Sequence, residues 1–372
     1  MAAAIACGGT GGHLFPGLAV GEELRRRGCA VTLMVSPKDV DQQAIGAIKG
    51  MEIVTLPAVA LTRAGLAGFL RGFCQSYQVA ARHFARCRPQ FVLAMGGFIS
   101  AAPVVAGKRY GARTYLHDSN SIPGRANRWL ARLVDGAFVY FPPAARQLRA
   151  RRVEVTGMPV RPQFLRPMTP EDARRALELN PEQPVLLVMG GSQGATKINQ
   201  WVLDIVPQLR DAIPNLQFIH FTGTVDFEKV RAFYQERRIP AFVRSFFDAM
   251  GTALAAADVA LSRAGASSLA EMAARQLPSV LVPYPTAADN HQFFNARAFV
   301  QSGAARMLRQ ETASPGQLAR ELTDLLCDPL KRSAMQRALA AWRTPEAAAE
   351  IAAKLMNWEV PVKNYDCLRA AL

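Results

Sequence analysis

An apolar run that leads through a glycine-rich turn into a helix occurs twice in this chain, and this repeat most constrains the fold. The first copy runs from residues 2–7 through "GGTGGH" into "LAVGEELRRRG", whose apolar positions recur at helical spacing. The second begins at "QPVLLVMGG" and continues into "SQGATKIN". Further strands are predicted at "CAVTLMVS", "PQFVLAMGG", "ARTYLHDSN", "GAFVYFP", "LQFIHFTG", "PAFVRSFF", "ADVALSRAGA" and "LPSVLVPYP".

Strands that alternate with helices favour mostly parallel sheets that are covered on both faces. The chain has 372 residues, which suits two ordinary domains. A proline-rich segment at 158–166 separates the two copies of the repeat. We therefore expect an α/β protein with two Rossmann-like, doubly wound domains, at 1–160 and 161–341, facing a cleft. A helical tail at 342–372 is expected to pack back on the first domain.

Basic residues are concentrated in the first half of the chain. Residues 1–160 contain 20 Lys and Arg against 8 Asp and Glu, whereas the whole chain has 44 against 29. This asymmetry indicates an anionic partner, which could be a nucleic acid, an acidic membrane or a phosphorylated substrate. Solvated arginines with no partner would give the same count. A nucleic acid is the least favoured partner, because no recognised binding module or aromatic stacking motif accompanies the charge.

Cysteines and apolar segments narrow the class of protein further. The six cysteines show no C-x-x-C pair and no zinc-like Cys/His spacing, so we expect reduced thiols and no metal site. The N-terminus "MAAAIACGG" lacks the basic region of a signal peptide. The longest uncharged stretch, 91–107, contains glycines and a proline, which disfavours a membrane-spanning helix. Any membrane contact is therefore expected to be peripheral.

The two glycine-rich turns predict phosphate binding, because a glycine turn that opens a helix exposes backbone N–H groups at its positive end. The dinucleotide pattern G-x-G-x-x-G is not met, since Leu14 stands in place of the third glycine. The second strand also has no carboxylate before Asp39. Neither turn contains the Gly-Lys-Ser/Thr of the Walker pattern. Nicotinamide and P-loop chemistry are therefore disfavoured, and a tight turn without a ligand is the alternative.

Six motifs occur in order along the chain: "GGTGGHLFPGLAV", "GGFISAAP", "HDSN", "GGSQGA", "SRAGASSLAE" and "DNHQFFNA". Together they resemble the MurG family, which adds N-acetylglucosamine to the lipid-linked muramoyl-pentapeptide precursor of peptidoglycan. The resemblance covers nearly the whole chain. It implies a GT-B fold with the acceptor on the N-terminal domain, the UDP-sugar on the C-terminal domain, and neither a metal nor a cofactor.

The resemblance implies that His13 reaches into the cleft. An inverting transfer needs a base for the proton of the attacking 4-hydroxyl group, and histidine has a suitable pKa. His13 could instead bind the acceptor diphosphate, or have no task. Asp118, within "HDSN", is a second candidate base. The family more often has His-Glu-Gln-Asn there, so the carboxylate is shorter in reach and Ser119 replaces a larger glutamine.

For the donor, the resemblance implies that Glu271 accepts hydrogen bonds from the ribose diol and that main-chain groups of Phe247 pair with uracil. The "GGSQGA" turn would hold the diphosphate, whose charge backbone donors can stabilise without a metal. Asp289 and Gln292 would hold the N-acetylglucosamine. The expected donor contacts are Thr10, Gly11, Gly12, Asn120, Arg161, Ser192, Gln193, Gly194, Phe247, Ala266, Glu271, Asp289 and Gln292.

Arg161 is expected to place a cation near the leaving group. Met158 stands where the family usually has asparagine, so any polar role of that asparagine is lost. The expected acceptor contacts come from the first glycine turn, from "GGF" and from "HDSN": Gly9, Thr10, His13, Gly96, Gly97, Phe98, His117 and Asn120.

Residues 61–88 form a basic amphipathic stretch. Leu66, Leu70 and Phe73 share one predicted helical face, with Arg63 and Arg71 nearby. Basic residues beside exposed apolar ones bind anionic bilayer surfaces. An ordinary helix that faces the core, with its arginines in water, gives the same pattern.

We therefore expect an inverting, metal-independent transferase at the cytoplasmic face of the bacterial plasma membrane. Its expected partners are UDP-N-acetylglucosamine, the lipid-linked muramoyl-pentapeptide and an anionic membrane surface, and other cell-wall and division proteins are further candidates. One alternative is another UDP-sugar enzyme of this fold, such as a glycolipid transferase or a UDP-N-acetylglucosamine 2-epimerase. A second is a diverged scaffold of the division machinery without catalytic activity.

Overall fold

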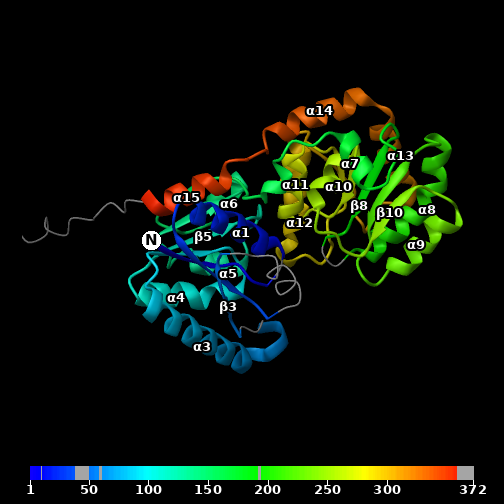
Figure 1. Cartoon of the computed structure of the whole chain (residues 1–372). Coiled ribbons are helices and arrows are strands. Elements are labelled where there is room, and N and C mark those ends of the chain that lie inside the picture. The colour runs from blue at the N-terminus through cyan, green and yellow to red at the C-terminus, as the bar shows by residue number, and fades with distance from the viewer. Residues whose placement is uncertain (10, 38–49, 58–60, 192–193, 358–372) are drawn as a thin grey trace, which may run out of the picture.

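The computed structural model describes residues 1–9, 11–37, 50–57, 61–191 and 194–357, with the backbone alone described at 61–64 and 66. Two lobes lie side by side, and each is built around one sheet with helices packed against it (Figure 1). Every strand pair within the two sheets is parallel. The predicted α/β architecture of two doubly wound units is confirmed, whereas the domain boundaries stay a prediction.

The N-terminal sheet has the strand order β3-β2-β1-β4-β5-β6-β7. Its strands are β1 (Ala2–Ala6), β2 (Ala30–Val35), β3 (Glu52–Thr55), β4 (Phe91–Ala94), β5 (Arg113–Asp118), β6 (Gly136–Val139) and β7 (Val153–Val155). The order reverses beside β1, which pairs with β2 on one side and with β4 on the other. In parallel sheets this reversal opens a crevice at the carboxyl ends of the strands, where ligands bind.

Helices cover both faces of this sheet: α1 (Gly11–Arg26), α3 (Leu61–Cys87), α4 (Ala101–Arg109), α5 (Arg125–Leu130) and α6 (Pro142–Ala145), with a 3₁₀ turn η1 (Phe98–Ser100). Strand β1 shows why both faces need cover. Its Ala4 and Ala6 belong to the core beneath α3 and α4, whereas Ala3 and Ile5 belong to the core beneath α1. Over the described parts of the chain, no helix has both the length and the apolar character needed to cross a bilayer.

The C-terminal sheet has the strand order β10-β9-β8-β11-β12-β13. Its strands are β8 (Val185–Met189), β9 (Gln217–Phe221), β10 (Ala241–Arg244), β11 (Val259–Ser262), β12 (Ser279–Leu281) and β13 (Arg306–Met307). The helices around it are α7 (Pro170–Ala176), α8 (Thr196–Ala212), α9 (Phe227–Glu236), α10 (Met250–Ala256), α11 (Ala266–Ala274), α12 (His291–Gln301), α13 (Pro315–Cys327) and α14 (Pro329–Ala340), with 3₁₀ turns η2 (Pro162–Phe164) and η3 (Ala288–Asn290).

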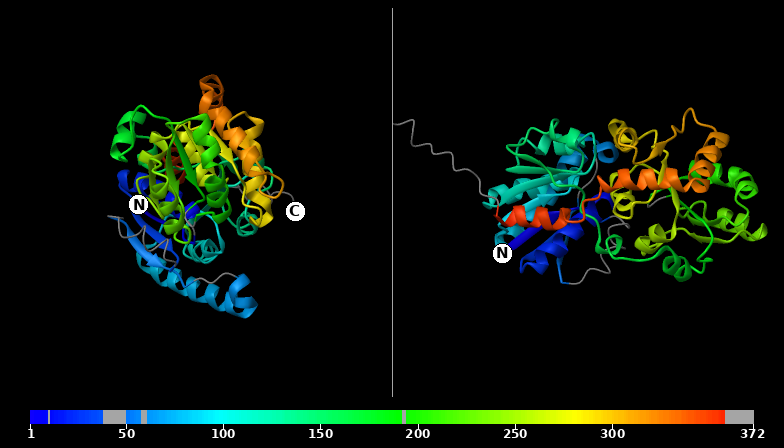
Figure 2. Two further views of the ribbon diagram at one scale, coloured as in Figure 1. Left: turned by 90° about the vertical axis from the view of Figure 1, so that its right-hand side faces the viewer. Right: turned by 90° about the horizontal axis from the view of Figure 1, so that it is seen from above.

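The chain crosses between the lobes twice, after β7 and after α14. After the second crossing, α15 (Ala347–Asn357) packs against α1, with Ile351 and Leu355 buried in the N-terminal core. Figure 2 shows α14 and α15 running from the second lobe to the first. The two crossings touch, because Met158 N donates to Thr344 Oγ1 over 3.2 Å. A Cβ at Gly157 would come within 2.4 Å of Thr344, so this contact requires glycine.

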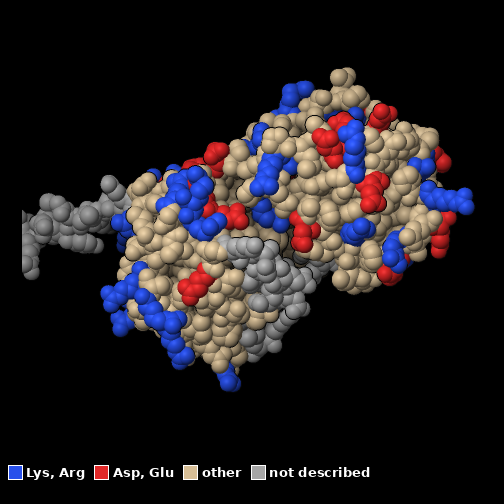
Figure 3. Space-filling model, in the orientation of Figure 1, with Lys and Arg blue, Asp and Glu red and all other residues tan. Residues whose placement is uncertain are grey.

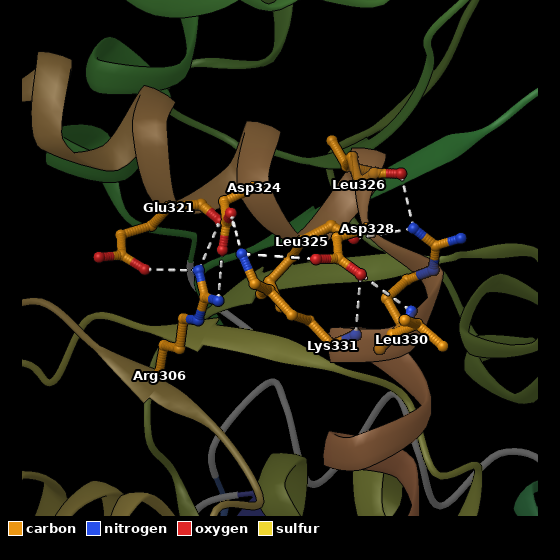
Figure 4. A network of polar contacts seen from close by, with 9 residues as sticks. Arg306, Glu321, Asp324, Leu325, Leu326, Asp328, Leu330 and Lys331 are labelled. Atoms are coloured by element: carbon orange, nitrogen blue, oxygen red, sulfur yellow. Dashed lines mark hydrogen bonds and ion pairs between the residues drawn. The ribbon is translucent and has the colours of Figure 1, made fainter.

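A polar network joins β13, α13 and α14 in the second lobe (Figure 4). Arg306 donates to Glu321 Oε2 over 2.7 Å and to Asp324 Oδ2 over 2.6 Å. Lys331 pairs with Asp324 and Asp328. Asp328 also caps α14, because its Oδ1 accepts from the backbone N–H of residues 330 and 331. This network lies within one lobe and contains none of the predicted site residues.

Candidate active site

A cavity of about 450 Å³ lies between the lobes, beside the carboxyl ends of strands from both sheets. It brings together nine of the predicted residues: Gly11, Gly12, His13, Asn120, Arg161, Phe247, Ala266, Glu271 and Gln292. Thr10, Ser192 and Gln193 lie outside the described residues. The remaining predicted residues are described but do not line the cavity: Gly9, Gly96, Gly97, Phe98, His117, Asp118, Gly194 and Asp289.

The N-termini of α1 and α11 open into this cavity. Gly11 and Gly12 begin α1, and Gly265 precedes α11 without a side chain to cap it. The two ends are close, because Ser267 Oγ donates to Gly12 O over 3.4 Å. Backbone N–H groups at a helix N-terminus and the helix dipole favour an anion at such a place. In the ranges that the structure covers, no three His, Cys, Asp or Glu side chains could together hold a metal ion.

The second glycine turn lies beside the same cavity, between β8 and α8. Gly191 lines the cavity and has φ 89°. A Cβ at Gly194, where φ is 77°, would stand 2.0 Å from Thr222 O. A Cβ at Gly190 would stand 2.4 Å from the N of Ala195. The turn therefore needs glycine at both positions, and its backbone can come close to a ligand.

Glu271 and Arg161 face each other across the cavity wall, with Glu271 Oε1 3.8 Å from Arg161 Nη2. The Glu271 side chain is 13% exposed, and burial raises its pKa to about 7, which the charge of Arg161 only partly offsets. Burial also lowers the pKa of Arg161. The guanidinium lies 4.0 Å from the ring centroid of Phe15 and 5.1 Å from that of Phe164. Glu271 accepts no side-chain hydrogen bond from any described residue, so it can accept them from a ligand.

Aromatic and thioether side chains form an apolar wall at the ends of β8 and β9. The ring of Phe247 stacks on Phe221 with centroids 5.6 Å apart. Phe246 and Met250 line the cavity beside them, as does Met189. A flat, partly apolar ligand group fits such a wall.

Gln292 lines the cavity with its amide orientation fixed. Its Oε1 accepts from the N of Ala264 over 3.2 Å and from the N of Tyr284 over 2.9 Å. Because both partners are backbone donors, the oxygen must face them, and the Nε2 group is left to donate to a ligand. His291, the preceding residue, contacts Ala288 O through Nδ1 over 2.8 Å.

Asp289 binds the other lobe instead of facing the cavity. Its Oδ1 pairs with Arg125 over 2.9 Å, and its Oδ2 pairs with Arg128. Both arginines lie on α5 of the N-terminal lobe. These hydrogen bonds hold the pKa of Asp289 below its usual range, and the one from Arg125 has the largest effect. Residues 289 and 290 both have left-handed φ, 51° and 53°, which turns the chain sharply before α12.

His13 lines the cavity, and its imidazole ring packs against Gly96 and Gly97. A Cβ at Gly96 would stand 3.0 Å from His13 Nε2, and one at Gly97 would stand 3.4 Å from His13 Cε1. Both glycines have positive φ, 113° and 76°. The lack of side chains at Gly96 and Gly97 in the "GGF" turn therefore leaves room for the imidazole ring. Gly9 and Phe98 lie in the adjoining turns, after β1 and at the start of η1.

The "HDSN" segment follows β5 and is largely buried. His117 Nε2–H donates to Gly157 O over 3.0 Å, and burial lowers the pKa of His117 to about 4, so the ring is neutral. Asp118 accepts from the N of Asn120, the N of Gly124 and Asn127 Nδ2. Burial raises the pKa of Asp118. The Asp118 carboxylate therefore braces the loop that carries Asn120 to the cavity.

Two contacts between residues that are distant in sequence could not be found by sequence reasoning. Phe15, under the guanidinium of Arg161, is separated from it by more than a hundred residues and belongs to another element. Asn295 joins the lobes through Asn120, as described below. Its place in "DNHQFFNA" is the one signal that pointed toward it.

Comparisons with known proteins agree over nearly the whole chain. Residues 3–139 match the glycosyltransferase family 28 N-terminal domain, and residues 185–352 match its C-terminal domain. The chain is 38% identical to the UDP-N-acetylglucosamine–N-acetylmuramyl-(pentapeptide) pyrophosphoryl-undecaprenol N-acetylglucosamine transferase of Anaeromyxobacter sp. (strain K), covering 94% of this chain and 90% of the relative. The transferase of that name from Sorangium cellulosum (strain So ce56) is also 38% identical, covering 95% and 87%.

Solved structures share the fold. MurG of Acinetobacter baumannii superposes with a TM-score of 0.74 at 24% identity, covering 95% of this chain and 99% of that chain. A UDP-GlcNAc 2-epimerase from Neisseria meningitidis, bound to UDP-GlcNAc, superposes with a TM-score of 0.70 at 14% identity, covering 96% and 100%. At these identities the likeness concerns the fold alone.

Proposed function

Because the chain belongs to the MurG family of glycosyltransferases, we propose that it moves N-acetylglucosamine from UDP-N-acetylglucosamine to the 4-hydroxyl of undecaprenyl-diphospho-muramoyl-pentapeptide. The observation that carries this proposal is Glu271 in the cavity wall. A buried carboxylate that accepts no side-chain hydrogen bond from the described residues suits the two hydroxyl donors of a ribose.

The donor fits the C-terminal side of the cavity. Uracil stacks against the wall around Phe247, with main-chain groups on its edge, and the ribose reaches Glu271. The diphosphate lies at the N-terminus of α11, between that helix and the second glycine turn, with Arg161 as the nearest cation. Gln292 Nε2 donates to the N-acetylglucosamine. We assign Asp289 to the lobe interface and not to the sugar.

The acceptor fits the N-terminal side. The first glycine turn and the N-terminus of α1 hold its diphosphate, and His13 stands at the cavity between the two substrates. The acceptor 4-oxygen attacks the anomeric carbon while the bond from that carbon to the UDP oxygen breaks, which inverts the configuration. His13 takes the hydroxyl proton. The charge that develops on UDP is stabilised by the α11 N-terminus and by Arg161.

A peripheral membrane contact on the N-terminal lobe would bring this site to a lipid-linked acceptor. Figure 3 shows basic side chains along the outer edge of that lobe, over α3 and α4. Leu70 is 52% exposed on α3, next to the exposed Arg71. The side chains of Arg63 and Leu66 are not described. Exposed apolar and basic groups together bind anionic bilayers, which supports a peripheral contact of this lobe with a membrane and, in our proposal, with the cytoplasmic face of the plasma membrane.

One assay separates this function from the alternatives. The pure protein is incubated with UDP-N-acetylglucosamine labelled in the sugar and with the lipid-linked acceptor. Label on the lipid supports the proposal. Free N-acetylmannosamine or its UDP derivative would support an epimerase, and unchanged donor would support a scaffold without activity.

A further inference from the structure

Asn295 is a fully buried carboxamide on α12 that contacts both lobes. Its Oδ1 accepts from the N of Ser121 over 2.8 Å. Its Nδ2 donates to Asn120 Oδ1 over 3.0 Å and to Ala264 O over 3.2 Å. A backbone N–H can only donate and a backbone carbonyl can only accept, so the orientation of the Asn295 amide is unambiguous.

The two lobes meet at this side chain next to both half-sites. Ser121 and Asn120 belong to the loop after β5, and Asn120 lines the cavity. Ala264 lies two residues before α11, and we place the donor diphosphate at the N-terminus of that helix. The N–H of Ala264 is in turn bound by Gln292 Oε1. Both backbone polar groups of Ala264 are therefore held by side chains of α12.

The hydrogen bond to Asn120 has a consequence for the cavity. Because Asn295 Nδ2 donates to Asn120 Oδ1, the amide oxygen of Asn120 faces α12. The Nδ2 group of Asn120 therefore points away from α12. The contact of that group with Ser119 Oγ is long, at 3.5 Å. Nδ2 is therefore left to donate to an oxygen atom of a ligand. If the Asn120 amide rotated by half a turn, it would present an acceptor to the same oxygen and repel it.

We propose that Asn295 is a positioning residue that fixes the Asn120 amide across the lobe boundary, so that Asn120 offers a hydrogen-bond donor to substrate. The inference rests on the proposed transfer reaction. It concerns a residue that does not line the cavity and that acts through one that does. Its hydrogen bonds are buried and made to uncharged partners, so they hold the amide without the salt dependence of the outer Asp289 contacts.

The first test is Asn295→Asp, which keeps the shape and still accepts from Ser121 but cannot donate. The Asn120 amide then turns its Nδ2 toward the new carboxylate. We expect kcat/KM for transfer to fall about 10- to 100-fold, the cost of replacing a donor by an acceptor against a ligand oxygen. The affinity for UDP alone, measured by calorimetry, should fall much less, because Glu271 and the wall around Phe247 are unchanged. An equal loss in both would overturn the proposal.

The second test is a double-mutant cycle with Asn120→Ala and Asn295→Ala. If Asn295 acts through Asn120, the double variant transfers sugar no more slowly than Asn120→Ala alone. Additive losses, or wild-type kinetics in Asn295→Ala, would overturn the proposal. Should a variant at 295 fail to fold, Asn120→Asp imitates the rotated amide without touching α12, and wild-type kcat/KM in that variant would equally overturn it. A wild-type enzyme that transfers no sugar would instead refute the proposed function.

Discussion

Glu271 Oε1 lies 3.8 Å from Nη2 of Arg161, so the two charged groups face each other without a direct hydrogen bond. Burial alone would favour their neutral forms, and it raises the pKa of Glu271 and lowers that of Arg161. A ligand that forms hydrogen bonds with either group therefore stabilises the charged form of that group. A nucleotide does so for both, because ribose hydroxyls donate to the carboxylate and phosphate oxygens accept from the guanidinium.

Replacing Glu271 by Gln should weaken UDP binding about 10- to 100-fold, because hydrogen bonds to a charged acceptor are lost. Calorimetric titration with UDP measures the effect. Glu22→Gln is the matched control, since burial raises the pKa of Glu22 as well and Arg161 acts on it, yet it does not line the cavity. If both variants bound UDP alike, Glu271 would not be the ribose ligand.

UDP binding should release protons near neutral pH. The pKa of Glu271 is about 7 in the free protein, and hydrogen bonds from ribose favour the charged form, so the bound pKa is lower. The affinity for UDP therefore falls as the pH falls through 7. Titrations at pH 7 in buffers of different ionisation enthalpy count the released protons. Proton uptake, or the same release in Glu271→Gln, would contradict this assignment.

Gly96→Ala should impair transfer and leave UDP binding intact. The new Cβ would stand 3.0 Å from His13 Nε2 and displace the ring. Gly111→Ala is the matched control, because Gly111 also has positive φ, 78°, but has open space around it. Both variants carry the backbone strain of about 1–2 kcal/mol, so both should melt earlier. We expect a loss of kcat of about tenfold or more in Gly96→Ala alone, since misplacing a reacting group costs up to 10²-fold.

The strands and glycine turns could be predicted from sequence because their signals are local. Apolar runs gave β1, β2, β8 and β9 in the expected places, and each of these strands has five or six residues. The short strands β3, β7 and β13 were not predicted. They lie at sheet edges with half-exposed residues, so they lack a continuous apolar run. An apolar run identifies a strand whose residues are buried on both faces of a sheet. This signal is weak for strands at the edges of a sheet.

Nine of the residues that line the cavity were predicted as site residues, but the partners of the predicted carboxylates were not. Asp289 was expected at the sugar, whereas its carboxylate pairs with Arg125 and Arg128 of the other lobe. Asp118 was a candidate base, and its oxygens accept hydrogen bonds from its own loop. A carboxylate binds whichever donors the tertiary fold brings near. Those donors come from elements that no local pattern relates to it.

The ion pairs of Asp289 with Arg125 and Arg128 join the two lobes, and we expect them to make a small contribution to the rate of transfer. Asp289→Asn removes the charge that faces Arg125 and Arg128, and we expect transfer to slow by no more than about fivefold, the range of an exposed ion pair. The slowing should vanish at high salt, where the pairs are already screened. Asp324→Asn is the control, because its pairs with Arg306 and Lys331 lie within one lobe (Figure 4). A loss of affinity for UDP-N-acetylglucosamine without a loss of affinity for UDP in Asp289→Asn would instead return Asp289 to the sugar site.

Membrane binding should depend on α3 and not on exposed apolar groups in general. Leu70→Glu places a charge where an apolar side chain would enter the headgroup region, and Arg71→Glu reverses a neighbouring attraction of about 1 kcal/mol. We expect the double variant to bind phosphatidylglycerol vesicles at least about tenfold more weakly in co-sedimentation at 0.15 M salt.

Leu330→Glu is the matched control for this surface, because Leu330 is 79% exposed on α14 in the other lobe. It should bind vesicles like the wild type. Transfer to a water-soluble acceptor analogue should be unchanged in all these variants, since none of them alters the cavity, while transfer to an acceptor embedded in vesicles should fall for the α3 variants. If Leu330→Glu reduced vesicle binding as much as Leu70→Glu, the membrane would not be recognised by the N-terminal lobe. Wild-type binding in the double variant would remove α3 from the membrane contact altogether.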